Sequence, residues 1–360
     1  MLFVVPLLLV CAWLAWEKYA LARRRAKIPL RLHVFGTRGK SGTVRALVAE
    51  LRGLGLRVYG RTTGEAPESL WPDGSTRLFR RFGPARVGEY GRVIREAAGL
   101  KAEALVLECM ALTPETIVAA GEMLAPGVVA LTNSRPDHQE SMGESPEEIA
   151  ATLALGAGEG REVYLVADAG FERFGLGAEK GGGRPHRLEE DFSPPAAAAR
   201  RLAQRIASDL RRREGGGAAE KAEALPTAEA EAWPAFRRFD VSGPLDFLDL
   251  FSVNDVVSSE LLLRRALAQG LWPEEGGAGS AGRPPLAALL AVRDDRPLRT
   301  KAFVEWLAAQ DIFDMVAVQG SHAWYGALAL KRRRVSGLAP LLNPGLEPKR
   351  LLALLRRRAG

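Results

Sequence analysis

The sequence predicts a mostly parallel α/β domain, which follows an apolar helix and precedes a smaller α/β domain. From residue 30 to about residue 178, short β-rich runs alternate with helical runs, which is typical of parallel sheets with crossover helices. The chain has 360 residues, which exceeds one ordinary domain and is ample for a buried core. Its apolar content of 47% and charged content of 26% are those of a globular protein.

The apolar start of the chain predicts a membrane helix. Residues 1–16, MLFVVPLLLVCAWLAW, carry no charged side chain, and Tyr19–Ala22 extend the run toward the length of a bilayer span. Trp13, Trp16 and Tyr19 suit the membrane interface, and basic residues follow the run but do not precede it. We therefore expect residues 1–22 to be a single-pass anchor in the cell membrane, with the rest of the chain in the cytoplasm. The alternative is a signal peptide cleaved near Ala20–Ala22.

Apolar and amphipathic runs place the elements of both domains. In the first domain, residues 30–235, we expect strands at Arg31–Phe35, Arg57–Thr62, Ala104–Glu108, Gly127–Thr132 and Glu162–Ala167, and helices at Thr43–Leu54, Val87–Ala98 and Pro146–Leu155. Within it, segment 175–235 has few large apolar residues, so we expect loose order apart from a helix at Ala196–Arg213. In the second domain, residues 236–360, we expect strands at Ala287–Val292 and Met315–Gln319, and helices near Ser258–Gln269, Thr300–Ala309 and Lys349–Arg358.

The turn after the first strand is a candidate phosphate site. It reads Gly36-Thr37-Arg38-Gly39-Lys40-Ser41 and leads directly into a helix. Backbone N–H groups at such a turn and the positive end of the following helix bind anions. Lys40 adds a charge suited to the outer phosphates of a nucleotide, and the Ser41 hydroxyl can ligate Mg²⁺. The general phosphate-loop pattern is matched only in part, because Val34–Phe35 stand where it has a glycine.

Two further predicted strands end in polar residues. Glu108 ends one apolar run, and the polar loop from Asn133 to Gly143 follows another. Ligands of open parallel sheets lie beyond the carboxyl ends of the strands, so these residues can meet the glycine turn. Glu108 can hold magnesium directly or through water, although acids at strand ends also often cap a neighbouring helix. His138 beside Asp137 is a second candidate, although a lone histidine is more often structural.

Charge and cysteine content narrow the class of protein. The net charge of +7 fits nucleic acid, an acidic membrane surface or an anionic substrate. The basic residues form short clusters without interleaved aromatic residues, at Arg23–Arg25, Lys331–Arg334 and Arg356–Arg358. We therefore expect solvated helix faces and a cluster next to the membrane, and no nucleic-acid partner. Cys11 and Cys109 make no disulfide framework, which suits a reducing compartment.

In their order along most of the chain, these features resemble the ligase subunits of poly-γ-glutamate synthases, the PgsB/CapB family of the Mur ligase superfamily. The N-terminal anchor and the segment Glu108-Cys109-Met110-Ala111 separate this family from the cell-wall and folate ligases. The other matching segments are Gly36–Arg45, Arg61–Gly64, Pro114–Glu115, Asn133–Gly143, Asn254–Asp255 with Ser258–Ser259, and Arg293–Thr300. The family normally continues past the equivalent of Arg358, so we expect either an incomplete second domain or a divergent one with impaired closure.

The resemblance implies a Mur ligase-like ATP-binding domain and roles for the matching residues. Lys40 would contact the β- and γ-phosphates of ATP, within a loop lined by Gly36, Thr37, Arg38, Gly39, Ser41 and Gly42. Magnesium would be held by Ser41, Glu108 and His138, and catalysis would depend on Lys40, Glu108 and His138. From the second domain, the nucleotide would be contacted by Asn254, Arg293 and Asp295. The substrate side would include Thr63 and Gly64.

The resemblance also implies the chemistry and the partners. A glutamate carboxylate would attack the γ-phosphate of ATP, and an amine would then displace phosphate from the acyl phosphate to leave a γ-glutamyl amide. The partners would be glutamate, the growing poly-γ-glutamate chain and small membrane subunits of a synthesis and export complex. Two alternatives stay open: another Mur-type or folylpolyglutamate-type ligase, and a non-catalytic ATP-binding scaffold of a membrane complex.

Overall fold

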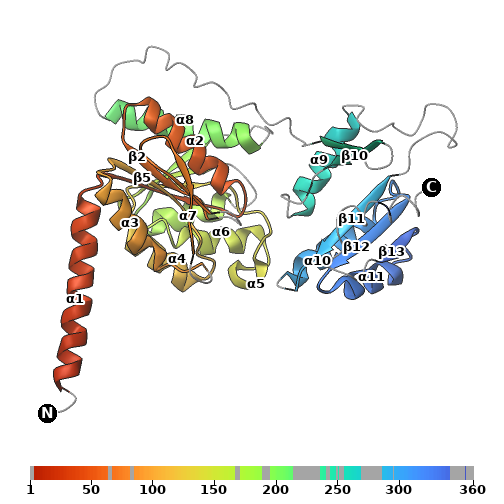
Figure 1. The fold of residues 1–360 in the computed structure, drawn as a ribbon, viewed down its shortest axis with the longest axis horizontal. Coiled ribbons are helices and arrows are strands. Elements are labelled where there is room, and N and C mark those ends of the chain that lie inside the picture. Colours follow the sequence, from red (N-terminus) through yellow and green to blue (C-terminus); the bar gives the residue numbers. More distant parts are fainter. Residues whose placement is uncertain are drawn as a thin grey trace. The chain divides into compact units, whose positions relative to one another are not determined.

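The computed structural model (Figure 1) describes residues 4–63, 67–81, 85–166, 171–188, 195–213, 236–240, 244–248, 250, 255–268, 286–294, 296–340 and 353. By their internal contacts, the residues divide into two compact units, Met1–Thr227 and Ala228–Gly360. The first unit contains an apolar helix and a large sheet, and the second contains two smaller sheets.

The first unit is built on an eight-stranded sheet with the strand order β4-β3-β2-β5-β1-β6-β7-β8. Its parallel strands are β1 (Leu30–Phe35), β2 (Val58–Arg61), β5 (Ala104–Glu108), β6 (Val128–Leu131), β7 (Glu162–Val166) and β8 (Arg184–Leu188). An antiparallel edge is added by β3 (Glu68–Leu70) and β4 (Thr76–Leu78). Because β1 lies between β5 and β6, the polar residues that follow these three strands emerge at one edge of the sheet. The predicted mostly parallel fold is confirmed.

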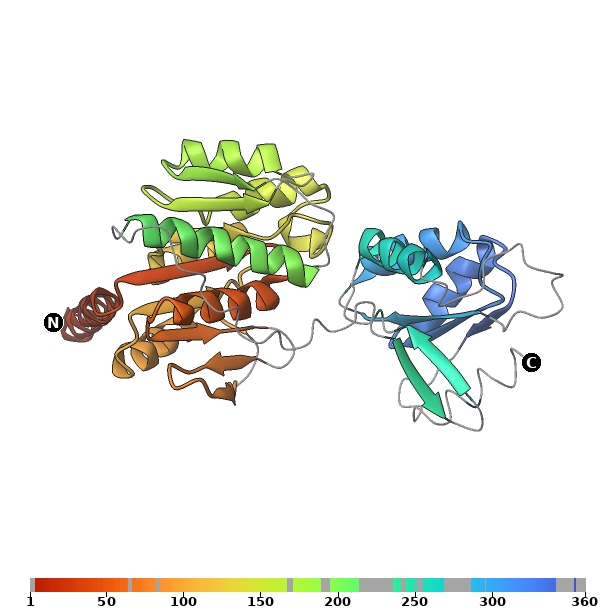
Figure 2. The same ribbon diagram turned by 90° about the horizontal axis from the view of Figure 1, so that it is seen from above.

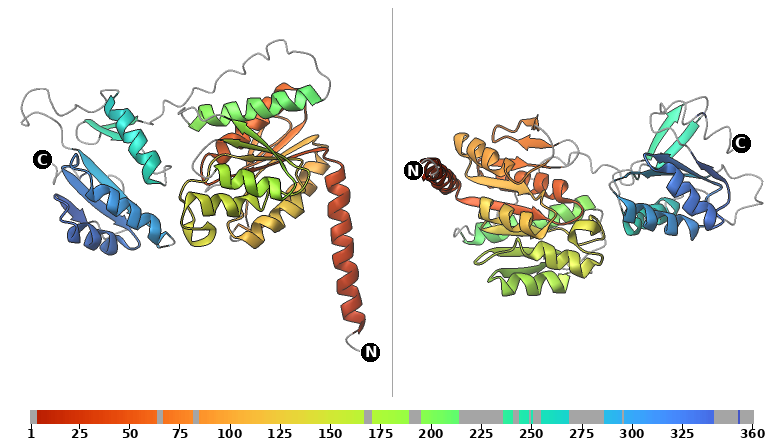
Figure 3. Two further views of the ribbon diagram at one scale, coloured as in Figure 1. Left: turned by 180° about the vertical axis from the view of Figure 1, so that it is seen from behind. Right: turned by 90° about the horizontal axis from the view of Figure 1, so that it is seen from below.

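Helices cover both faces of this sheet, as Figures 2 and 3 show. On one face α2 (Lys40–Gly53) packs against α8 (Pro195–Arg213), with Leu47 and Ile206 in the shared core. The other face is covered by α3 (Glu89–Gly99), α4 (Pro114–Leu124), α6 (Pro146–Ala154) and α7 (Phe171–Lys180). The central strands are therefore buried on both sides, which explains why β5 and β6 read as continuous apolar runs rather than alternating ones.

Local capping signals determine where α6 begins. The Ser145 hydroxyl accepts the Glu148 N–H at 3.2 Å, and the Glu148 carboxylate accepts the Ser145 N–H at 3.4 Å. Pro146 occupies the first helical position, where its missing N–H costs nothing. A short helix, α5 (Gln139–Met142), comes before this cap. The cap thus fixes the end of the polar loop that follows β6.

The apolar helix α1 (Val4–Ala26) is long and apolar enough to cross a membrane by its length and composition. It has no buried residues. Its C-terminal end is attached through Arg25, whose Nη1 donates to Glu122 O at 2.6 Å. Arg31 of β1 joins the same region, because its Nη1 donates to Arg25 O at 3.1 Å and its Nε donates to Ala125 O at 3.0 Å. The carbonyls of Glu122 and Ala125 belong to the C-terminal end of α4, where a positive charge is favourable. The base of the apolar helix is therefore joined directly to the sheet domain.

The second unit contains a parallel sheet of β11 (Ala287–Val292), β12 (Met315–Gly320) and β13 (Leu338–Pro340). Its helices are α9 (Val256–Ala268), α10 (Pro297–Ala308) and α11 (Ala323–Arg332), and Val304, Val318 and Leu330 lie in its core. A separate antiparallel pair is formed by β9 (Phe236–Asp240) and β10 (Pro244–Leu248). The helix predicted at Lys349–Arg358 lies outside the described residues, apart from residue 353.

The predicted strands of the first domain correspond to β1, β2, β5, β6 and β7, with small differences at their ends. Helix α2 begins at Lys40 rather than at the predicted Thr43, so the Lys40 and Ser41 side chains stand on its first turn. The hydrophobic pattern did not reveal β3, β4 or β8. The first two have three residues each, and Arg-Pro-His-Arg-Leu in β8 shows no apolar alternation. Both β8 and α8 lie within segment 175–235.

Candidate functional site

The turn between β1 and α2 adopts a conformation that its glycines permit. Gly36 has a φ of +130° and Gly39 a φ of +74°, in a region that side chains rarely adopt. A Cβ on Gly36 would lie 2.1 Å from Thr132 Oγ1, so the two segments approach too closely for any other residue. The first intrahelical bond runs from Thr43 N to Gly39 O. The three backbone amides before it have no partner within the helix and can bind an anion.

Asn133 holds this turn against the end of β6. Its Oδ1 accepts the Thr37 hydroxyl at 2.8 Å and the Arg38 N–H at 3.1 Å, and its Nδ2 donates to Arg38 O at 3.1 Å. The Thr132 hydroxyl donates to the same Arg38 carbonyl. Sequence reasoning marked these residues as the polar end of a strand but did not assign the clamp to Asn133. Only the neighbourhood of β1 and β6 in the sheet makes the clamp visible.

Lys40 folds back over the turn. Its Nζ donates to Gly36 O at 2.7 Å and to Thr37 O at 3.3 Å. Withdrawal from solvent lowers the pKa of Lys40 below its ordinary value, and the nearby charges of Glu108 and Asp137 oppose that shift. An ammonium group has three N–H donors, so a third donor can serve a phosphate oxygen without breaking the contacts to the turn.

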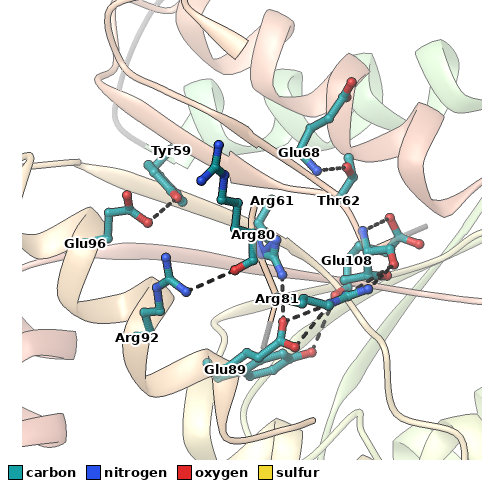
Figure 4. Close-up of polar contacts among 12 residues, drawn as sticks. Tyr59, Arg61, Thr62, Glu68, Arg80, Arg81, Glu89, Arg92, Glu96 and Glu108 are labelled. Atoms are coloured by element: carbon teal, nitrogen blue, oxygen red, sulfur yellow. Dashed lines mark hydrogen bonds and ion pairs between the residues drawn. The ribbon is translucent and has the colours of Figure 1, made fainter. Parts of the chain in front are cut away.

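Glu108, at the end of β5, joins two segments through a single oxygen atom. The Ser41 hydroxyl donates to Glu108 Oε2 at 2.7 Å, and the Thr63 N–H donates to the same oxygen at 2.9 Å. The carboxylate is buried, at 4% exposure, and Figure 4 shows it beside the strand that leads to Thr62. Within the described part of the chain, no hydrogen bond or ion pair is formed by Oε1 of this carboxylate. One carboxylate oxygen is thus held in place while the other can take a further ligand.

The chemistry of these donors fits magnesium. A hydroxyl and a carboxylate are the hard oxygen ligands that Mg²⁺ prefers, and it usually completes its shell with water and nucleotide phosphates. Among the described residues, no group of three or more His, Cys, Asp and Glu side chains is arranged to hold a metal ion. A magnesium ion at Ser41 and Glu108 would therefore rely on phosphate and water oxygens as well.

Asp137 and His138 form the other side of the polar loop. Arg38 Nη2 lies 3.2 Å from Asp137 Oδ2, and His138 Nε2 lies 3.7 Å from the same oxygen. The His138 N–H donates to Asp137 Oδ1 at 3.0 Å, and the His138 backbone has a left-handed φ of +53°. These contacts link His138 to the glycine turn through Asp137 and Arg38. A direct role of His138 as a metal ligand stays a prediction.

The remaining predicted site residues are only partly described. Thr63 lies next to Glu108, as given above, whereas Gly64 lies outside the described residues. In the second unit, Asn254 and Asp295 also lie outside them, and Arg293 is an exposed residue just after β11. The roles predicted for these five residues, and the ATP contacts of Gly42, stay predictions.

Parts of this chain are similar in sequence to proteins named CapB. Residues 237–357 match the family model described as poly-gamma-glutamate synthase CapB C-terminal domain. The capsule biosynthesis protein CapB of Bacillus anthracis is 33% identical over 138 residues, which are 38% of this chain and 30% of that protein. The PGA synthase CapB of Bacillus subtilis (strain 168) is 34% identical over 127 residues, 34% of this chain and 32% of that protein. The matches thus span about a third of each relative's length.

Solved structures of folylpolyglutamate synthases share the fold of this chain. The Mycobacterium tuberculosis enzyme complexed with ADP aligns with a TM-score of 0.59 and 16% identity, over 91% of this chain and 83% of that one. The Escherichia coli FolC complex with ADP has a TM-score of 0.52 and 15% identity, over 97% and 98% of the two chains. These likenesses show the fold, and the sequence matches confirm the predicted resemblance to CapB. Residues 237–357 are therefore similar to the CapB C-terminal domain of poly-γ-glutamate synthases, and the chain shares the fold of the folylpolyglutamate synthases.

Proposed function

We propose that this chain is an ATP-dependent ligase that joins glutamate units through γ-amide bonds, as in poly-γ-glutamate synthesis. The observation that carries the proposal is the contact between Ser41, on the first turn after the glycine loop, and the strand-end acid Glu108. It unites a phosphate-binding turn with an oxygen ligand for magnesium. The CapB family match of residues 237–357 supports glutamate as the substrate class.

ATP would bind with its phosphates over the glycine turn. The amides at the start of α2, which have no partner within that helix, and the positive end of the helix would meet the phosphate oxygens. Lys40 would add its ammonium charge to the β- and γ-phosphates while it keeps its contact with Gly36 O. Magnesium, held by Ser41, Glu108 and His138, would neutralise charge on the phosphates. Asn254, Arg293 and Asp295 of the second unit would contact the nucleotide.

The reaction would proceed by two displacements. A glutamate γ-carboxylate oxygen attacks the γ-phosphorus of ATP, the bond to the β-γ bridging oxygen breaks, and an acyl phosphate and ADP form. The amine of a second glutamate then attacks the acyl carbon, and phosphate leaves with the electrons of the broken C–O bond as the amine loses a proton. Both steps gather negative charge near Lys40 and the α2 amides, which are fixed before the reaction starts. No protein nucleophile is needed.

Exclusion of water matters for this chemistry, because water can hydrolyse the acyl phosphate before the amine attacks it. We infer that Thr63 and Gly64 lie on the substrate side of the site and help to exclude water there. The position of Thr63 next to Glu108 Oε2 supports this role.

Membrane attachment is the remaining part of the proposal. The helix α1 would anchor the chain in the cell membrane with the ATP site in the cytoplasm, where ATP is available. The length, composition and lack of buried residues of α1 support this role. Small membrane subunits would act as partners in synthesis and export of the polymer.

The proposal is tested with membranes that contain the full chain. Phosphate release is measured with ATP and Mg²⁺, with and without glutamate, for the wild type and for Lys40→Ala. We expect glutamate-dependent release in the wild type and a loss of about 100-fold in the variant, typical of removing a preorganised charge. Equal rates in the two proteins would contradict the ligase mechanism. A glutamate-independent ATPase that the variant lacks would instead favour the non-catalytic scaffold.

A further inference from the structure

A cluster of charged side chains, formed by Arg61, Arg81 and Glu89, lies near the end of β2 (Figure 4). Arg61, at the end of β2, is 1% exposed, and its guanidinium carbon lies 3.1 Å from the centre of the Phe79 ring. Its Nη2 donates to Glu89 Oε2 at 2.7 Å, and the Arg81 Nε donates to Glu89 Oε1 at 3.1 Å. Two guanidinium groups thus share one carboxylate from the start of α3.

This cluster is connected to the candidate metal ligand through one residue. Both Nη atoms of Arg81 donate to Thr63 O at 3.3 Å. The N–H of Thr63 donates to Glu108 Oε2 at 2.9 Å, next to the 2.7 Å bond from the Ser41 hydroxyl. The carbonyl of Thr63 therefore faces the charged cluster, and its amide faces the acid. A shift of Thr63 would therefore weaken the hydrogen bond from its N–H to Glu108 Oε2.

The contribution of this cluster to the stability of the fold does not by itself explain its presence. Taking a guanidinium out of water is costly, and a buried ion pair often contributes less than apolar packing would. In Arg61 the cost is only partly offset, because its Nε and Nη1 are buried without a hydrogen-bond partner in the described residues. Burial lowers the pKa of Arg61, and the Glu89 carboxylate opposes that shift. Because the cluster is costly and lies next to a candidate metal ligand, its position indicates that it serves the metal site rather than stability.

We propose that Arg81 and Glu89, supported by Arg61, are positioning residues that hold the Thr63 amide on Glu108 and thereby fix this carboxylate for a divalent cation. The inference rests on the metal–nucleotide site of the proposed function and not on the identity of the amine substrate. Residues behind metal ligands commonly change metal affinity by 10- to 100-fold when they are removed.

The test compares Arg81→Met with Arg92→Met in the purified full chain. Arg92 is a matched control, because its guanidinium carbon also lies over the Phe79 ring, at 4.5 Å, but its hydrogen bond goes to Arg80 O. The dissociation constant of Mn²⁺ is measured by electron paramagnetic resonance with ADP present, and ADP affinity is measured separately in EDTA. A second variant, Glu89→Gln, keeps the size of the side chain and removes its charge. Thermal unfolding checks that each variant is folded.

We expect Arg81→Met to raise the Mn²⁺ dissociation constant by about tenfold, with ADP affinity in EDTA within about twofold of the wild type. Glu89→Gln should change it in the same direction, and Arg92→Met should leave it unchanged. Unchanged Mn²⁺ binding in Arg81→Met and Glu89→Gln, an equal loss in Arg92→Met, or a wild type that binds no Mn²⁺ would each overturn the inference. Failure of the proposed function is a different result: a wild type that binds Mn²⁺ and ADP but releases no phosphate with glutamate.

Discussion

The Ser41 hydroxyl donates a hydrogen bond of 2.7 Å to Glu108 Oε2, although 67 residues separate the two along the chain. The sheet explains this contact. β1 and β5 are parallel neighbours with Val34 opposite Glu108, so α2 begins next to the end of β5. Thr63 follows β2, which lies on the other side of β5, and its N–H reaches the same oxygen. The carboxylate is thus the meeting point of three segments that leave the sheet at one edge.

This arrangement predicts that ATP turnover requires more magnesium when Glu108 or His138 is replaced. Glu108→Ala and His138→Ala should each raise the magnesium concentration for half-maximal ATP turnover, by about tenfold or more for a direct ligand. Magnesium titrations of phosphate release measure it. Glu103→Ala, which removes an exposed acid just before β5, is the control and should not change the requirement. If neither Glu108→Ala nor His138→Ala alters the titration, the metal assignment is wrong.

Asn133→Ala should weaken nucleotide binding through the shape of the turn. The substitution removes the acceptor for the Thr37 hydroxyl and the Arg38 N–H, and each unsatisfied buried group costs about 1–3 kcal/mol. We expect ADP affinity, measured by calorimetry, to fall by about tenfold or more, which corresponds to about 1.4 kcal/mol. Ser75→Ala removes a local hydrogen bond to Asp73 away from the turn and should leave ADP affinity unchanged. Wild-type affinity in Asn133→Ala would rule out the clamp.

The two ends of the turn–helix segment should respond in opposite ways to alanine. At Gly36 a Cβ would lie 2.1 Å from Thr132 Oγ1 on a backbone with φ of +130°, so Gly36→Ala should destabilise the domain by about 2 kcal/mol or more. At Gly53, the last residue of α2, a Cβ would meet no atom within 4 Å. Gly53→Ala should stabilise by about 0.5–1 kcal/mol. Thermal unfolding midpoints measure both, and a Gly36→Ala protein as stable as the wild type would contradict the close approach.

The ion pairs of Glu162 predict that part of the free energy of unfolding is lost in acid. The Arg213 guanidinium, with help from His186 and Arg184, lowers the pKa of this buried carboxyl to about 2 from its ordinary value near 4.5, although burial opposes the shift. Because the pKa is lower in the folded state, the carboxylate stabilises the fold above about pH 4.5, and this contribution is lost as the pH falls toward 2. We expect the wild type to lose about 2 kcal/mol more than Glu162→Gln between pH 6 and pH 3. Parallel unfolding curves for the two proteins at pH 6 and pH 3 measure the difference, and equal losses would contradict it.

The parts of the fold that follow from local pattern were predictable from the sequence. The strand–turn–helix from β1 to α2 needs only a short strand rich in apolar residues, two glycines and a helical period, all within residues 30–53. The end of β5 at Glu108 was predictable because an acid interrupts a continuous apolar run. The short strands β3 and β4 were not, because three residues are too few to show a period and all those of β4 are exposed.

The contacts that complete the site depend on strand order, which the sequence does not state. Asn133 reaches Thr37 across 96 residues because β6 lies next to β1. Arg61 is a large basic residue at the end of a strand, and its pattern gives no sign that it is 1% exposed and stacked on Phe79. The role of such a residue can be recognised only in the folded sheet, which brings β2, the edge pair β3–β4 and α3 together.

The most direct measurement follows oxygen from substrate to phosphate. Glutamate labelled with ¹⁸O in its γ-carboxylate is incubated with ATP, Mg²⁺ and membranes that contain the chain, and the released phosphate is analysed by mass spectrometry. An acyl phosphate between ATP bound at the glycine turn and glutamate requires that one ¹⁸O atom from the carboxylate leave with each phosphate, and that Lys40→Ala abolish this transfer. Released phosphate that contains no ¹⁸O would contradict the ligase mechanism.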